Sequence, residues 1–303
     1  MNIICQFDRW RFLAITLFLI QVNYPGIAGN VALVQGTISL PNAAERQYSL
    51  RLTETMSRWL NSLGINHKIL KDEEVSEHTL QESKIAVLIY NANLLRNEIT
   101  AFQKFVSRGG KLVVFYSSDP ELAKLMGIKL GNYLAAKSHN QWAAFKMNEK
   151  APPHMPIRVS QISRNIRLAA PISGKSVVIG YWEDSTKVPS QYPAWLFSNK
   201  GFWMTHVLLD DGDSLNKKQL LLALLGWCDP GLWKVAAKAS LKNVGTIGKY
   251  SNLEEALQTL ESSKAAPSRR LSKKIILNSR EHYLEASTMM ARGDYASVIQ
   301  TCN

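Results

Sequence analysis

The chain has 303 residues and a formal net charge of +12; 46% of its residues are hydrophobic and 20% are charged. These values are typical of an ordinary globular protein, and the length allows one large domain or two smaller ones. The three cysteines form no CxxC or Cys/His spacing, which excludes the usual zinc sites.

The first 28 residues predict a secretory signal peptide. Two arginines precede an apolar run over residues 12–22, and Gly26 and Ala28 fit the −3 and −1 positions of a cleavage site. We therefore expect cleavage before Gly29 and export to the periplasm or the cell exterior. The apolar run is shorter than the ~20 residues that a spanning helix needs, so no stable membrane span is expected after cleavage.

The mature chain would keep a net charge of about +11 and two cysteines, Cys228 and Cys302. An oxidising compartment would allow the two thiols to pair, and two separate thiols are the alternative. Basic residues are scattered, with one acid-free concentration over residues 264–280. An acidic polymer or membrane surface could bind there, but a solvent-exposed helix face is the favoured interpretation, and no nucleic-acid partner is expected.

The first half of the chain alternates short apolar runs with helical patterns, which predicts a parallel, doubly wound sheet. The runs are Val31–Gly36, Asn66–Leu70, Lys84–Tyr90 and Lys111–Tyr116, and the amphipathic segments are Ala44–Leu63 and Glu98–Ser107.

The stretch from Gly109 to Gly127 predicts a turn, a buried strand, a second turn and a short helix. Asp119 is expected to cap the helix, Pro120 to begin it, and Gly127 to end it in a left-handed conformation. In an open α/β sheet, ligands and nucleophiles lie in the loop that leaves the carboxyl end of such a strand.

The second half predicts antiparallel edge strands and then helices. Strand-like segments cover residues 141–147, 176–182, 194–197 and 202–209, with a hairpin turn at 199–201. An apolar helix follows over Leu215–Cys228, capped by Asp213 or Ser214. The predicted fold class is α/β, with a flavodoxin-like or amidotransferase-like, mostly parallel sheet in a domain over residues 29–230.

Residues 231–303 predict a helical linker region. Helical periodicity covers residues 253–263 and 272–292, and Gly293 begins the turn of a helix pair. The second arm of that pair starts at Tyr295 and has only a few residues, which suggests that the natural protein continues beyond this sequence.

No glycine-rich phosphate motif follows any predicted strand, so no dinucleotide or other cofactor is expected. Ser117 and Ser118 stand where a nucleophile elbow would be, but no glycine flanks them. His206 could act as their base, with Asp210, Asp211 or Asp213 orienting it. The favoured alternative is that the serines bond the turn, His206 packs at a strand end, and the aspartates cap the next helix.

Two binding interpretations are weaker. The run from Asp210 to Asp213 lacks the alternating ligands of a calcium loop, and no metal site is expected. Five tryptophans lie in the second half of the globular region, and Trp182 or Trp203 could stack on a glycan. Most of these rings are expected to pack in the core instead.

Three phrases carry a resemblance to a known family. They are GGKLVVFYSSDPELAKLMGIKLG, THVLLDDGDSLNKKQLLLALLGWCDPGLW and SREHYLEASTMMARGDYASVI. In this order they resemble the N-terminal region of secreted bacterial glycosyl hydrolases of the family ten-like glycosylhydrolase group. There, a module similar to class I glutamine amidotransferases precedes a helical linker and a (β/α) barrel. The resemblance covers roughly Val31 to Gln300.

The resemblance implies a module whose catalytic groups are lost. Amidotransferases use a Cys elbow and a His-x-Glu pair, whereas this chain has two serines at the elbow and Leu208 in place of the glutamate. The first hypothesis is a non-catalytic accessory, positioning or glycan-binding module of an exported, carbohydrate-active enzyme whose barrel is missing here. The alternatives are a weak hydrolase using Ser117 or Ser118 with His206, and a structural oligomerisation domain.

Overall fold

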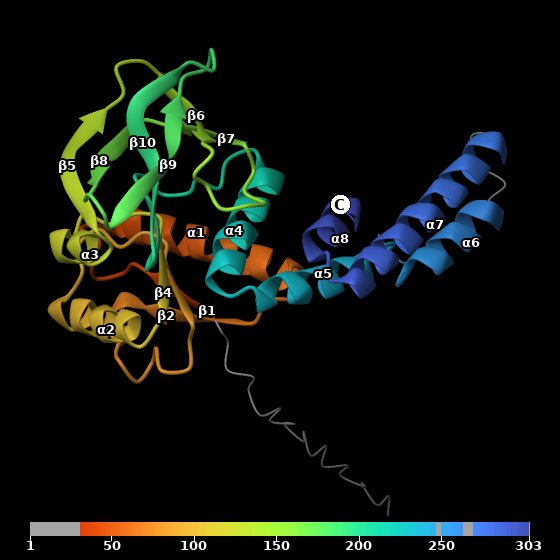
Figure 1. The fold of residues 1–303 in the computed structure, drawn as a ribbon, viewed down its shortest axis with the longest axis horizontal. Coiled ribbons are helices and arrows are strands. Elements are labelled where there is room, and N and C mark those ends of the chain that lie inside the picture. The colour runs from red at the N-terminus through yellow and green to blue at the C-terminus, as the bar shows by residue number, and fades with distance from the viewer. Residues whose placement is uncertain (1–30, 247–249, 263–268, 303) are drawn as a thin grey trace, which may run out of the picture.

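The computed structural model describes residues 31–246, 250–262 and 269–302 (Figure 1). The predicted signal peptide and cleavage site lie outside the described residues. The strands are β1 (Val31–Gln35), β2 (His67–Lys71), β3 (Ile85–Leu88), β4 (Lys111–Val114), β5 (Ile128–Ala135), β6 (Trp142–Met147), β7 (Arg158–Ser163), β8 (Asn165–Pro171), β9 (Ser176–Glu183), β10 (Pro189–Ser198) and β11 (Gly201–Met204). The α-helices are α1 (Ala43–Ser62), α2 (Arg96–Ser107), α3 (Pro120–Leu125), α4 (Ser214–Cys228), α5 (Gly231–Asn243), α6 (Leu253–Ser262), α7 (Arg269–Arg292) and α8 (Tyr295–Cys302), and a 3₁₀ turn, η1, covers Asp72–Glu74.

A nine-stranded sheet with the order β2-β1-β3-β4-β11-β10-β9-β6-β7 organises the fold. The strands from β2 to β11 in this order are parallel, and those from β11 to β7 are antiparallel. The parallel half has the order of flavodoxin-like doubly wound sheets. The predicted α/β fold class is therefore confirmed, and the antiparallel side is a four-strand extension.

Two apolar cores cover the two faces of the parallel strands. Alternate residues of β1 separate between them: Val31 and Leu33 face the core that α1 and α4 share, and Ala32 and Val34 face α2 and α3. All of these side chains are buried. Burial on both faces explains why the strands are continuous apolar runs rather than alternating ones.

The stretch from β4 to α3 forms as predicted. The side chain of Asp119 accepts the backbone N–H of Leu122 at 2.8 Å, and Pro120 is the first helical residue. Gly127 follows with a φ of +77°, a conformation that costs glycine little and other residues more. Strand β4 ends at Val114, so Phe115 and Tyr116 already belong to the loop at the carboxyl edge.

The antiparallel half is only partly as predicted. Strands β10 and β11 form the expected hairpin, with Ser198 paired to Gly201. The predicted strand over residues 202–209 ends at Met204, because the chain leaves the sheet after pairing with β4. Strands β5, β7 and β8 were not predicted, and β5 pairs with β8 in a separate two-stranded sheet.

Helices α5 and α8 share a core with the α/β part. Figure 1 shows α8 beside α5, while α6 and α7 extend away from the sheet. Val298 and Ile299 of α8 are buried in the same apolar cluster as Leu232 and Ala236 of α5. The predicted turn at Gly293 is present, with a φ of +80°. None of the described helices is long and apolar enough to cross a membrane.

Candidate functional site

The carboxyl ends of the five parallel strands meet at one edge, where an open α/β sheet normally binds ligands. Ser117 and Ser118 follow β4 at this edge. The Ser117 hydroxyl is buried and accepts the backbone N–H of Asp119 at 3.2 Å. The Ser118 hydroxyl donates to the carbonyl oxygen of Ala92 at 2.6 Å, and its N–H donates to the same oxygen at 2.9 Å. Both serines thus hold loops together.

His206 follows β11, the neighbour of β4, and is buried. Its Nδ1 lies 2.9 Å from the carbonyl oxygen of Val207, which fixes the proton on Nδ1 in the neutral ring. Burial lowers the pKa of His206, although the bond to Val207 and the charge of Asp211 act in the opposite direction. The ring is therefore neutral at pH 7.

Gln161 of β7 fastens the segment that carries His206. Its Nε2 donates to the Val207 carbonyl at 3.0 Å and lies 3.4 Å from His206 Nδ1, and its Oε1 accepts the N–H of Leu209 at 2.9 Å. Among the described residues, no hydrogen bond joins His206 to Ser117 or Ser118. The candidate nucleophile and base therefore have separate hydrogen-bond partners, as in the alternative that the sequence favours.

The aspartates after His206 each have a separate partner. Asp210 pairs with Arg51 at 2.9 Å, and Asp211 pairs with Lys217 at 2.9 Å. In the part of the chain that the structure describes, Asp210 forms no hydrogen bond or ion pair with His206, so it does not orient that ring.

Asp213 occupies the N-cap position of α4, as the sequence predicts, but its side chain bonds elsewhere. One oxygen accepts the backbone N–H of Ser160 at 2.6 Å and the other accepts the amide of Asn216 at 2.7 Å. Within the described residues, no three His, Cys, Asp or Glu side chains lie close enough to hold a metal ion.

The crevice between β1 and β3, where the strand order reverses, is closed by the protein itself. A Cβ at Gly36 would lie 1.9 Å from the carbonyl oxygen of Tyr90, so the two loops are in backbone contact. Asp72, the residue after β2, accepts the backbone N–H groups of Thr37 at 2.7 Å and Ser39 at 2.9 Å. Backbone donors that could hold an anion are thus already occupied.

Three buried polar residues near this edge were missed in the sequence: Asp72, Asn91 and Glu98. Glu98 accepts the backbone N–H of Leu95 at 2.7 Å, but its other oxygen and both amide atoms of Asn91 have no partner in the described protein. Burial raises the pKa of Glu98 to about 8. The hydrogen bond from Leu95 acts to lower this pKa, and the negative charge of Asp72 acts to raise it. The only sequence signal was their position just after strands and at a helix start.

The two tryptophans considered for glycan binding are core residues. The Trp182 ring is fully buried, and its Nε1 donates to the Thr205 hydroxyl at 2.9 Å. Trp203 is buried in the core beneath α2 and α3. Neither ring has a free face for a sugar, because both fill the space between sheet and neighbouring elements.

Cys228 and Cys302 are free thiols. Burial raises the pKa of Cys228 to about 12, with a nearby Lys111 acting against it. Burial also raises the pKa of Cys302. Neither thiol has the lowered pKa of a reactive cysteine.

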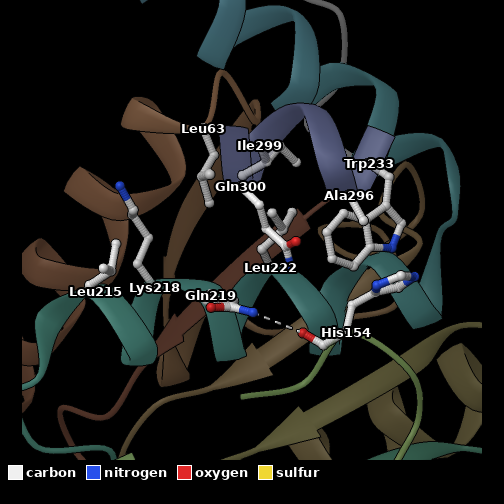
Figure 2. A pocket seen from close by; sticks show the side chains of 10 residues that line it. All are labelled: Leu63, His154, Leu215, Lys218, Gln219, Leu222, Trp233, Ala296, Ile299 and Gln300. Carbon is white, nitrogen blue, oxygen red and sulfur yellow. Dashed lines mark hydrogen bonds between the residues drawn. The ribbon is translucent and has the colours of Figure 1, made fainter. Parts of the chain in front are cut away.

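A cavity of about 250 Å³ lies away from the sheet edge, where α8 packs against the α/β part (Figure 2). It is lined by Leu63, His154, Leu215, Lys218, Gln219, Leu222, Trp233, Ala296, Ile299 and Gln300. The walls are mainly apolar, and Lys218 is the one lysine or arginine among the lining residues. No sequence motif marks this cavity, because its residues come from distant segments.

No protein-family model matches the chain, and no curated protein matches its sequence. Among solved structures, the chain is similar to a ThuA-like protein from Bacteroides uniformis ATCC 8492, with 17% identity and a TM-score of 0.51 over 69% of this chain and 94% of that one. At this identity the likeness shows the fold alone. Together with the sheet order, this likeness shows an α/β fold with a flavodoxin-like, mostly parallel sheet.

Two further structures are similar at lower scores. A cold-adapted β-galactosidase from Rahnella sp. R3 has 13% identity and a TM-score of 0.48, over 66% of this chain and 31% of that one. A glutamine amidotransferase from Methylobacillus flagellatus has 9% identity and a TM-score of 0.41, over 91% of this chain and 94% of that one.

Proposed function

We propose that residues 29–303 form the non-catalytic accessory region of an exported glycosyl hydrolase whose catalytic barrel lies outside this sequence. One observation carries the proposal: the candidate catalytic groups Ser117, Ser118 and His206 at the carboxyl edge bond to the protein's own loops. Ser117 supports the turn before α3, and His206 is held by Val207 and Gln161 in a separate network. A hydrolase needs a nucleophile within about 2.6–3.2 Å of its base, and these groups are not bonded.

Within this role, positioning is better supported than sugar binding. Trp182 and Trp203 are buried, so the aromatic platforms on which glycan binding depended are used for packing. Helices α5 and α8 share the core of the α/β part, so this portion of the helical region is packed against the module. This packing would help the module to hold a catalytic barrel that follows the helices in a defined position.

The test is to read the coding frame beyond codon 303 and to express the whole protein. We expect barrel-like βα repeats with paired carboxylates and hydrolysis of aryl glycosides. Replacing those carboxylates should abolish the hydrolysis, whereas Ser117→Ala and His206→Gln should leave it unchanged. A stop codon directly after Asn303 would refute the proposal, as would glycoside hydrolysis by residues 29–303 alone.

A further inference from the structure

The cavity in Figure 2 has a shape and composition that the accessory role does not explain. Its volume of about 250 Å³ corresponds to roughly eight water-sized groups at about 30 Å³ each. Leu63, Leu222 and Ile299 are buried and form its apolar walls. Such walls bind apolar groups more favourably than water.

One end of the cavity is aromatic and fixed. The rings of Trp233 and His154 meet edge to face, with centroids 5.1 Å apart and an interplanar angle of 65°. The indole of Trp233 lies over Gly226, where a Cβ would be 2.2 Å from its Nε1. The backbone carbonyl oxygen of His154 accepts a hydrogen bond from the side chain of Gln219 at 3.3 Å, which holds the backbone of His154 in place.

The opposite end is cationic. Figure 2 shows Lys218 at the far side of the cavity from Trp233, with Gln300 between them. Lys218 is partly buried, and its side chain forms no ion pair or hydrogen bond within the described part of the chain. The lining residues include no carboxylate, so nothing in the cavity neutralises the ammonium group.

We propose that this cavity binds a small aromatic carboxylate, with its ring against Trp233 and its carboxylate at Lys218. The apolar body replaces water at the walls, and the carboxylate meets an unpaired cation of a protein whose net charge is +12. An uncharged sugar fits poorly, because the walls would leave most of its hydroxyl groups unpaired.

The experiment uses 3-phenylpropionate, with 3-phenylpropylamine and glucose for comparison, against residues 29–303. Titration calorimetry and saturation-transfer NMR should show one saturable site for the carboxylate. The amine should bind at least tenfold more weakly, because its charge repels Lys218, and glucose should not bind. No carboxylate binding at millimolar concentration, or equal binding of the amine, would overturn the proposal.

Two variants locate the site. Lys218→Gln should weaken carboxylate binding about tenfold, whereas Lys234→Gln, on an exposed lysine of α5, should not change it. Ala296→Phe should fill the cavity and abolish binding, and Ala291→Phe, at an exposed position of α7, is the matched control. Binding that survives both Lys218→Gln and Ala296→Phe would place the ligand elsewhere. If the Ala296→Phe variant does not fold, the comparison of Lys218→Gln with Lys234→Gln decides whether the ligand binds in the cavity.

Discussion

The carboxylate of Asp72 accepts the backbone N–H of Ser39 at 2.9 Å, which joins the residue after β2 to the loop after β1. The same carboxylate accepts the N–H of Thr37 and the hydroxyl of Thr37. A buried acid therefore organises the loop that in related sheet topologies receives a ligand. The segments after β1 and β2 are thus bonded to each other.

Asp72→Asn should destabilise the protein by about 2 kcal/mol at pH 7, since a charged acceptor of several N–H groups is lost. Burial alone would raise the pKa of Asp72, but bonds from Glu73, Ser39 and Thr37 hold it below its ordinary value of 3.8. The stabilisation is thus present above pH 3.8 and lost as the pH falls further.

Urea unfolding at pH 7 and pH 3 measures this effect, with Glu82→Gln, an exposed position, as the control. The difference in the free energy of unfolding between wild type and Asp72→Asn should be smaller at pH 3 than at pH 7. Equal stability at pH 7 would show that the carboxylate does not hold the loop.

Glu98 should make the protein less stable as the pH rises. Burial raises its pKa from 4.5 to about 8, so the folded state holds this proton more tightly than the unfolded state. The stability that Glu98 contributes is full below pH 4.5 and is lost as the pH rises through about 8. Glu98→Gln keeps the acceptor for Leu95 and removes the titration.

We expect the free energy of unfolding of Glu98→Gln to depend less on pH than that of wild type, with a difference of about 3 kcal/mol accumulated between pH 5 and 8. Glu121→Gln, in the exposed first turn of α3, should retain the wild-type slope. If the free energy of unfolding depended on pH equally in wild type and Glu98→Gln, the raised pKa of Glu98 would be contradicted.

The ion pair of Lys217 and Asp211 is asymmetric, because the lysine side chain is 1% exposed and the aspartate side chain is 52% exposed. Asp211→Ala leaves a buried ammonium without its carboxylate and should cost about 3 kcal/mol. Lys217→Met leaves a carboxylate that water can solvate and should cost less than about 1 kcal/mol. Chemical denaturation of both variants tests this, and the reverse order of costs would show that burial does not govern the pair.

Gly36→Ala should destabilise the protein by roughly 3 kcal/mol, because its Cβ would meet the backbone oxygen of Tyr90 at 1.9 Å. Gly231→Ala is the control, since its Cβ would meet only a side-chain oxygen of Asp229 at 3.2 Å. Thermal unfolding compares the two. A neutral Gly36→Ala would mean that the loops after β1 and β3 separate easily and that the crevice can open.

The parallel half could be predicted from sequence because burial on both faces makes β1, β3 and β4 continuous apolar runs. Strand β7 could not, because it reverses the usual pattern. Its buried face carries Gln161 and Ser163, while Ile162 is 41% exposed. Gln161 points inward to bond the loop that carries His206, a purpose that only the tertiary structure shows.

The sequence predicts where the candidate site lies, but not which hydrogen bonds its side chains form. The sequence places Ser117 after a buried strand and His206 on a late strand expected at the antiparallel edge, whereas the structure pairs β11 with β4 in parallel. The sequence could not show that the two side chains bond to different neighbours. The cavity beside α8 had no sequence signal at all, since Leu63, His154, Leu222 and Trp233 are far apart in the chain.

The most direct test of the non-catalytic role measures hydrolysis of p-nitrophenyl acetate and of glutamine by purified residues 29–303. The comparison is the triple variant Ser117→Ala, Ser118→Ala and His206→Gln, with folding checked by circular dichroism. We expect wild type and triple variant to have the same rate as buffer. Hydrolysis by the wild type that disappears in the folded triple variant would contradict the account and identify a Ser/His hydrolase.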